Sequence, residues 1–145
     1  MDTGLFSVLE FHTFFERPVR AAPGIPADPD LCALRVRLLR EEVTELEAAI
    51  EAGDLVEVAD ACGDIQYVLD GTFLTFGLHR LKAALIEEIH RSNLTKLGAD
   101  GRPLLRADGK ILKGPDFQPP MLGRFIETEL RRLGAPLPDN SHDRP

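Results

Sequence analysis

Residues 39–71 read LREEVTELEAAIEAGDLVEVADACGDIQYVLDG, and the fold prediction rests on the pattern of this segment. Aliphatic residues recur at steps of three and four up to residue 50, which predicts an amphipathic α-helix over about residues 31–52. Gly53 ends that helix, and a second helix follows to about Phe76. Because the break between them is short, the two helices should pack antiparallel as a hairpin. The expected core stripe of the first helix consists of Val36, Leu39, Val43, Leu46 and Ile50.

Side chains that cap helices mark where both helices begin. Asp30 is the predicted N-cap of the first helix and Asp54 that of the second, because an aspartate oxygen accepts hydrogen bonds from the free N–H groups of a first turn. Glu57 stands three residues after Asp54, the spacing of a capping box.

The rest of the chain is also mainly helical in pattern. Prolines between a predicted N-terminal helix at residues 4–16 and residue 30 indicate a stiff connector. An Asp108-Gly109 turn indicates a short hairpin or extended arm. We therefore predict an all-α fold, a helical bundle of four to five helices in a single domain over residues 1–133, with a disordered tail at 134–145. The further predicted helices span residues 4–16, with an aromatic face, 79–97 and 121–133.

Charge and hydropathy exclude several kinds of partner. Among 145 residues, 24 are acidic and 17 are Lys or Arg, for a net charge of −7. A general nucleic-acid binder needs a basic face, so no nucleic acid is expected as a partner. No apolar run approaches the roughly 20 residues that span a bilayer, so no membrane contact is expected and a cytoplasmic location is predicted.

Acidic residues lie on the sides of the two helices that should face each other. Steps of three and four residues return to the same side of a helix, so Glu42 and Glu45 share one face. The hairpin should place Glu45 near Asp60 and Glu42 near Asp64. The acidic residues of the two faces are Glu41, at the edge, Glu42, Glu45, Glu57, Asp60 and Asp64.

These like charges need a cation. No Lys or Arg occurs from residue 41 to residue 79. Two carboxylates about 4 Å apart repel by about 4 kcal/mol at an effective dielectric constant near 20. Mg²⁺ or Mn²⁺ would remove this repulsion, since both prefer oxygen ligands and keep water positions that a phosphate can take. A metal cofactor, Mg²⁺ or Mn²⁺, is therefore predicted.

The motifs resemble one enzyme superfamily. EEVTE at 41–45, followed by carboxylates on the next helix, is similar to the EExxE…ExxD signature of the all-α nucleoside triphosphate pyrophosphohydrolases, which include MazG, the phosphoribosyl-ATP pyrophosphohydrolases and the dimeric dUTPases. FHTFF at 11–15 and IHRSNLTKLGADGRPLLRADGKILKGPDFQPP at 89–120 resemble the MazG-like branch.

One position departs from the signature. Ala61 stands three residues before Asp64, where the family has Glu, so the second half of the site is either Asp60 with Asp64 or Glu57 with Asp60; we favour Asp60 with Asp64.

The resemblance implies hydrolysis of a nucleoside triphosphate to the monophosphate and diphosphate, with dUTP as the favoured substrate and a role in clearing unwanted nucleotides. It also implies a homodimer or a dimer of dimers. Glu41 would be a further metal ligand or the base that orients water. The residues expected to contact nucleotide are Asn93, Lys96, Lys110, Lys113, Tyr67 and His12; solvated lysines, and core packing for Tyr67 and His12, are the alternatives.

Two other functions are compatible with parts of the sequence. Glu87-x-x-His90 has the spacing of a di-iron ligand pair, but such a site needs two copies on different helices and the chain has one. A helical dimerisation or regulatory module without catalysis is the other alternative, and failure to bind both metal and nucleotide would support it.

Overall fold

The computed structural model describes residues 3–137 and, over that range, contains five α-helices and no β-strand. This confirms the predicted all-α fold. The chain divides into two compact units, Met1–Arg80 and Leu81–Pro145. Most of the tail predicted to be disordered lies at 138–145, outside the described residues. None of the described helices is both long and apolar enough to cross a lipid bilayer.

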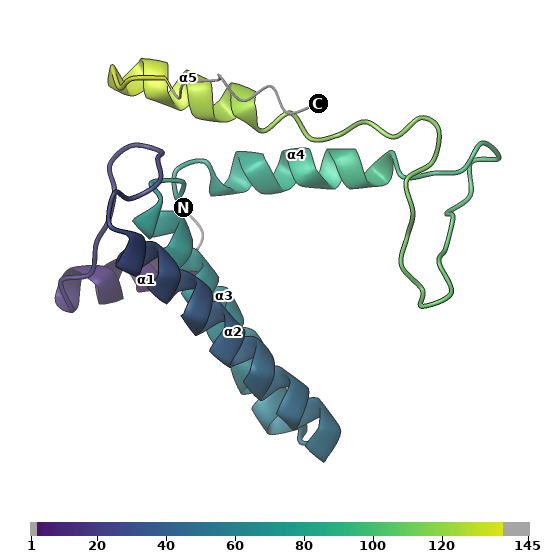
Figure 1. Cartoon of the computed structure of the whole chain (residues 1–145), viewed down its shortest axis with the longest axis horizontal. Helices are drawn as coiled ribbons and strands as arrows, with labels where there is room; N and C mark the ends of the chain where they lie inside the picture. The colour runs from purple at the N-terminus through teal and green to yellow at the C-terminus, as the bar shows by residue number, and fades with distance from the viewer. Residues whose placement is uncertain (1–2, 138–145) are drawn as a thin grey trace. The chain divides into compact units, whose positions relative to one another are not determined.

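The first unit contains the predicted helical hairpin. Helix α2 spans Pro29–Ala52 and α3 spans Leu55–Thr75, and the two pack along each other (Figure 1). Gly53 ends α2 with φ 67°, a left-handed conformation that glycine adopts without steric cost. The antiparallel arrangement expected from the short break is therefore confirmed.

The cap of α2 differs from the prediction. Asp28 is the N-cap, and its Oδ1 accepts from the backbone N–H groups of Asp30 at 2.9 Å and Leu31 at 3.4 Å. Asp30 lies inside the first turn. The reason is Pro29, whose fixed φ suits the first helical position and whose missing N–H costs nothing there.

The cap of α3 is the predicted Asp54, but the capping box is incomplete. Asp54 Oδ1 accepts from the N–H of Val56 and of Glu57. The backbone N–H of Asp54 donates to Ala49 O at 3.0 Å, a bond of the preceding helix end. The group that a capping-box glutamate would bind is therefore already bonded, and the predicted capping role of Glu57 is wrong.

Helix α1, Thr3–Phe14, packs on α3 mainly through aliphatic residues, and of its aromatic residues Phe11 contacts α3 at Tyr67. Leu5 and Val8 are 1% exposed and form the core of this unit with Leu74 of α3. The phenylalanines of the predicted aromatic face stay accessible; Phe6, Phe11, Phe14 and Phe15 are all at least 40% exposed.

The expected core stripe of α2 is also mostly accessible. Val36, Val43 and Ile50 are 48%, 53% and 61% exposed. The residues of α2 that face α3 are each one position before a residue of this stripe, about 100° around the helix. They include Arg35, which precedes Val36, and the buried Ala49, which precedes Ile50. Helical periodicity identified an apolar face correctly, but it carries no information about which face meets α3.

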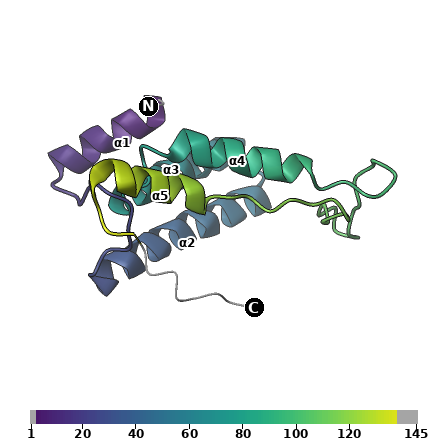
Figure 2. The same ribbon diagram turned by 90° about the horizontal axis from the view of Figure 1, so that it is seen from above.

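The second unit contains α4, Lys82–Leu94, and α5, Gly123–Leu133, both shorter than the predicted helices. The segment between them forms the predicted arm, which extends beyond the end of α4 (Figure 2). An antiparallel bridge joins Leu105 and Ile111 around a turn at Asp108-Gly109, where Gly109 has φ 86°.

Buried Glu88 holds the end of the arm against α4. It is 4% exposed and accepts hydrogen bonds from Arg91 at 2.8 and 2.9 Å and from the backbone N–H of Met121 at 2.8 Å. Ser92 Oγ donates to Gln118 O at 2.7 Å. These contacts connect the segment before α5 to the middle of α4.

Candidate metal centre

Glu42 lies at the centre of a group of carboxylates contributed by both helices of the hairpin. Its side chain is half-buried. Burial raises the pKa of Glu42, and four neighbouring carboxylates raise it further: Glu45, Asp64, Glu41 and Asp60. The structure therefore brings together the acidic residues predicted to face each other across α2 and α3. We call these five residues the carboxylate cluster.

Glu57 is placed apart from this cluster. Among the described residues, it is not one of the carboxylates that raise the pKa of Glu42. It lies seven residues before Asp64, two helical turns or about 10 Å along α3. This placement favours the pair Asp60 and Asp64 over the pair Glu57 and Asp60, although the ligands themselves stay a prediction.

The chemistry of the cluster fits a hard divalent cation. Every donor is a carboxylate oxygen, which Mg²⁺ and Mn²⁺ prefer. Within residues 3–137, no three Asp, Glu, His or Cys side chains already stand in an arrangement that holds a metal ion. Glu41, Glu45, Asp60 and Asp64 are exposed, and exposed side chains change rotamer within nanoseconds. Side-chain rotation is therefore available to these four carboxylates when an ion binds.

Arg35, which the sequence analysis did not identify, lies on the inner side of the hairpin. Its Nε donates to Thr72 Oγ1 at 3.2 Å and its Nη2 donates to Val68 O, so one side chain of α2 is bonded to two residues of α3. The sequence could have placed Arg35 on this side of α2, because Arg35 and Glu42 are seven residues apart and so share one side of the helix.

His12 is enclosed next to Arg35. It is 3% exposed, and its Nδ1 is 3.1 Å from Pro18 O. A carbonyl only accepts, so Nδ1 carries the proton and Nε2 is the acceptor in the neutral ring. Burial lowers the pKa of His12, and the charges of Arg35 and Arg17 lower it further. The imidazole of His12 is therefore a buried, packed side chain of the first unit.

Tyr67 borders the cluster from α3. Its ring meets the edge of Phe11 at a centroid distance of 5.7 Å, and Phe11 also contacts Phe15 at 4.4 Å. Burial raises the pKa of Tyr67, and the charge of Glu10 adds to this. With Tyr67 36% exposed, these rings form a partly open aromatic surface between α1 and α3.

The other predicted nucleotide contacts belong to the second unit. Asn93 is exposed near the end of α4, and the backbone N–H of Lys96 donates to its carbonyl at 3.1 Å. Lys110 and Lys113 are exposed in the arm, where Lys113 Nζ lies 4.6 Å from the centroid of the Phe117 ring. Their predicted contacts with phosphate, base or sugar stay predictions.

Opposed carboxylates on an antiparallel helical hairpin are the arrangement that the resemblance to the all-α pyrophosphohydrolases implies. Residues 8–93 match the phosphoribosyl-ATP pyrophosphohydrolase family, which is more than half of the chain. The chain belongs to this family, part of the MazG-like nucleoside triphosphate pyrophosphohydrolase superfamily.

A viral protein is also similar to part of the chain. The chain is 33% identical over 97 residues to the uncharacterized protein L479 of Acanthamoeba polyphaga mimivirus. The match covers 65% of this chain and 39% of the viral protein.

Proposed function

We propose that the protein is a metal-dependent nucleoside triphosphate diphosphatase, which converts a (deoxy)nucleoside triphosphate and water to the monophosphate and diphosphate. The observation that supports the proposal is the gathering of carboxylates from two helices around Glu42, whose pKa is raised by burial and then by Glu45 and Glu41 of α2 and Asp64 and Asp60 of α3. Membership of a pyrophosphohydrolase family supports the same reaction class.

Glu42, Glu45, Asp60 and Asp64 are the proposed ligands of Mg²⁺ or Mn²⁺. When bound, the ion supplies charge neutralisation for the phosphates and the leaving diphosphate, and it lowers the pKa of the attacking water. Glu41, exposed at the edge of the cluster, is either a further ligand or the base that orients this water.

The proposed substrate is a deoxynucleotide, with dUTP first, in a role that clears unwanted nucleotides. Support for this choice is the resemblance to the dimeric dUTPases. The test is a panel of triphosphates and phosphoribosyl-ATP, each with Mg²⁺ and with Mn²⁺, in which diphosphate and orthophosphate are measured separately. Orthophosphate as the first product would contradict the reaction. Failure of every nucleotide and metal to bind would favour a helical module without catalysis.

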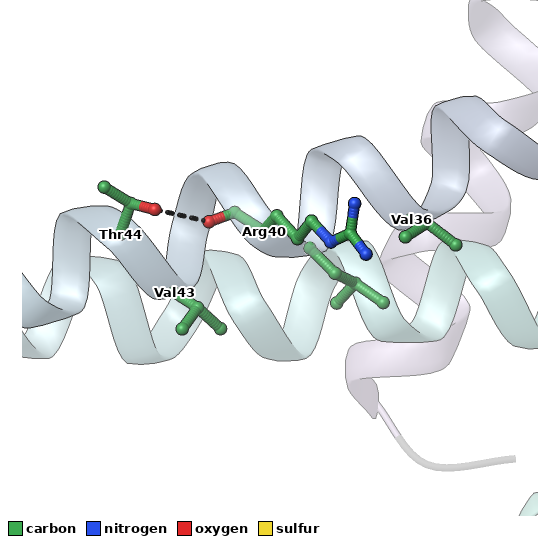
Figure 3. A pocket seen from close by; sticks show the side chains of 5 residues that line it. Val36, Arg40, Val43 and Thr44 are labelled. Carbon is green, nitrogen blue, oxygen red and sulfur yellow. Dashed lines mark hydrogen bonds between the residues drawn. The ribbon is translucent and has the colours of Figure 1, made fainter.

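We also propose that a second copy of the chain packs on the exposed stripe of α2. Val36, Leu39, Val43, Leu46 and Ile50 follow the alternating steps of three and four that form the seam of two-stranded helical packing. Part of this stripe lines a hollow of about 430 Å³ together with Arg40 and Thr44 (Figure 3).

The charges beside the stripe favour an antiparallel pair of α2 helices. Arg40 and Glu47 occupy equivalent positions on either side of Val43, seven residues apart. In an antiparallel pair centred near Val43, Arg40 of each copy meets Glu47 of the other, whereas a parallel pair would oppose like charges. Support for a homodimer therefore comes from charge complementarity as well as from the apolar stripe.

A further inference from the structure

Arg35 is the most enclosed cation of the hairpin and is bonded entirely to α3. Its guanidinium donates to Val68 O and to Thr72 Oγ1, and the Thr72 hydroxyl itself donates to Val68 O at 3.0 Å. Arg35 lies on the same side of α2 as Glu42, but its guanidinium is bonded to a carbonyl and a hydroxyl of α3. Its effect on the carboxylate cluster therefore comes from holding the two helices together.

The position of this contact sets the register of the carboxylates. On α2, Arg35 is seven residues before Glu42, and on α3, Gly71 is seven residues after Asp64. Seven residues are about two turns, so each pair shares a side of its helix about 10 Å apart. In an antiparallel hairpin, the pairing of Arg35 with the Val68–Thr72 turn therefore implies that Glu42 is level with Asp64.

Gly71 permits the close approach on which this contact depends. A Cβ at residue 71 would lie 2.6 Å from Arg35 Nη2 and 2.9 Å from His12 Nε2. Both distances are below van der Waals contact, so a side chain there would displace Arg35 and the imidazole from α1. We call Arg35, Gly71, Thr72 and the carbonyl of Val68 the α2–α3 clasp, with His12 covering it.

We propose that Arg35 is a positioning residue: its clasp on α3 keeps the carboxylate cluster face to face against the mutual repulsion of its members. The cluster lies between two attachments, the Gly53 turn at one end of the hairpin and the clasp at the other. Repulsion pushes the helices apart between them. Only the consequence for metal affinity rests on the proposed function; the effect on the metal-free hairpin does not.

The test compares four variants of the full chain without metal. Arg35→Gln removes the charge and the fork of donors, Arg35→Lys keeps the charge but replaces the planar fork with a single ammonium nitrogen, and Gly71→Ala displaces the clasp without altering any polar group. Arg37→Gln is the matched control, because it removes the same charge from an exposed position of the same helix. Amide hydrogen exchange of peptides covering residues 40–46 and 60–66 is followed at about 10 mM and 1 M salt, where the Debye lengths are about 30 and 3 Å.

We expect Arg35→Gln and Gly71→Ala to lose at least about tenfold in protection of these peptides at low salt, the factor that one hydrogen bond to a charged group supplies. High salt should restore most of this protection, since it screens the repulsion. Arg35→Lys should fall between, and Arg37→Gln should match the wild type. Gly71→Ala is informative because alanine stabilises a helix interior more than glycine does. If the clasp had no effect on the cluster, this variant should therefore show more protection than the wild type.

Three outcomes would overturn the proposal: unchanged protection in Arg35→Gln, increased protection in Gly71→Ala, or a loss that salt does not reverse. The last would show that Arg35 only contributes general stability. Titration with Mn²⁺ alone, followed by electron paramagnetic resonance, separates the two proposals. A wild type that binds no Mn²⁺ contradicts the metal centre, while the salt-dependent opening of the variants still decides the role of the clasp.

Discussion

Glu42 is the carboxylate whose removal should most change the balance between stability and metal binding. Replacement by Gln keeps the size of the side chain and removes one negative charge from the centre of the cluster. Burial raises the pKa of Glu42 and four neighbouring carboxylates raise it further, so the ionised form is disfavoured in the folded chain. We expect Glu42→Gln to make the metal-free protein more stable and to weaken Mn²⁺ binding sharply.

The size of the stabilisation follows from the number of repelling neighbours. Like charges one helical turn apart on an exposed helix destabilise by about 0.2–0.5 kcal/mol per pair. Taking a repulsion of this size for each of the four neighbours, on α2 and on α3, gives about 1–2 kcal/mol at low ionic strength. For a chain of this length, that raises the unfolding midpoint by roughly 2–8 °C. At 1 M salt the gain should shrink to a small fraction, because the Debye length falls to about 3 Å.

The pH dependence has a definite sign. A glutamate whose pKa is raised in the folded state binds protons more tightly there than in the unfolded state, so its folded form loses stability as pH rises from about 4.5 through the raised value. At neutral pH the wild type carries the full repulsion. The advantage of Glu42→Gln should therefore be present at pH 7 and vanish below about pH 4.

Thermal unfolding of metal-free protein by circular dichroism measures this effect, with and without Mn²⁺. Glu51→Gln is the control, since Glu51 lies nine residues further along α2, two and a half turns from Glu42 on the opposite side. The wild type and Glu51→Gln should both gain stability from Mn²⁺, and Glu42→Gln should gain little. If metal-free Glu42→Gln were no more stable than Glu51→Gln at low salt, the assignment of Glu42 to the centre of a repulsive cluster would be wrong.

Three further predictions concern other parts of the chain. Asp64→Asn should lose metal affinity and most turnover while Glu57→Gln keeps a substantial part of both, as measured by Mn²⁺ titration and diphosphate release; the reverse pattern would move the site toward the start of α3. Hydrogen bonds from Arg91 and the Met121 N–H lower the pKa of Glu88 to about 2, so the stability that ionised Glu88 gives to the segment before α5 should be lost as pH falls from about 4.5 to 2. Glu88→Gln should remove this acid sensitivity, as measured by hydrogen exchange of residues 118–124. Arg40→Glu and Glu47→Arg should each weaken dimers in sedimentation velocity, and their combination should restore them; no recovery in the double variant would refute the antiparallel arrangement.

Much of the candidate site could be predicted from the sequence because helix periodicity is a local property. Steps of three and four residues place Glu42 and Glu45 on one side of α2, and the short break at Gly53 requires an antiparallel return. The facing of these glutamates with Asp60 and Asp64 followed from those two facts. The motif around EEVTE added the reaction class, which family membership supports.

Local pattern also set the limits of prediction. The spacing of Val36, Val43 and Ile50 describes an apolar face equally well whether α3, a second copy or solvent lies against it. Asp30 and Asp28 are both suitable caps by residue type, and the conformational restriction of Pro29 selects between them. The aromatic residues of α1 resembled a core face, yet the aliphatic side of that helix packs on α3.

The helices, their hairpin and the side of each helix that carries the acidic residues could be predicted from local sequence, because these features depend on neighbours within a few positions. The bonds of Arg35 to Val68 and Thr72, and the room that Gly71 leaves for Arg35, are visible in the folded chain alone. These contacts join residues more than 30 positions apart, and their existence depends on the distance between two packed helix backbones, which no local pattern specifies.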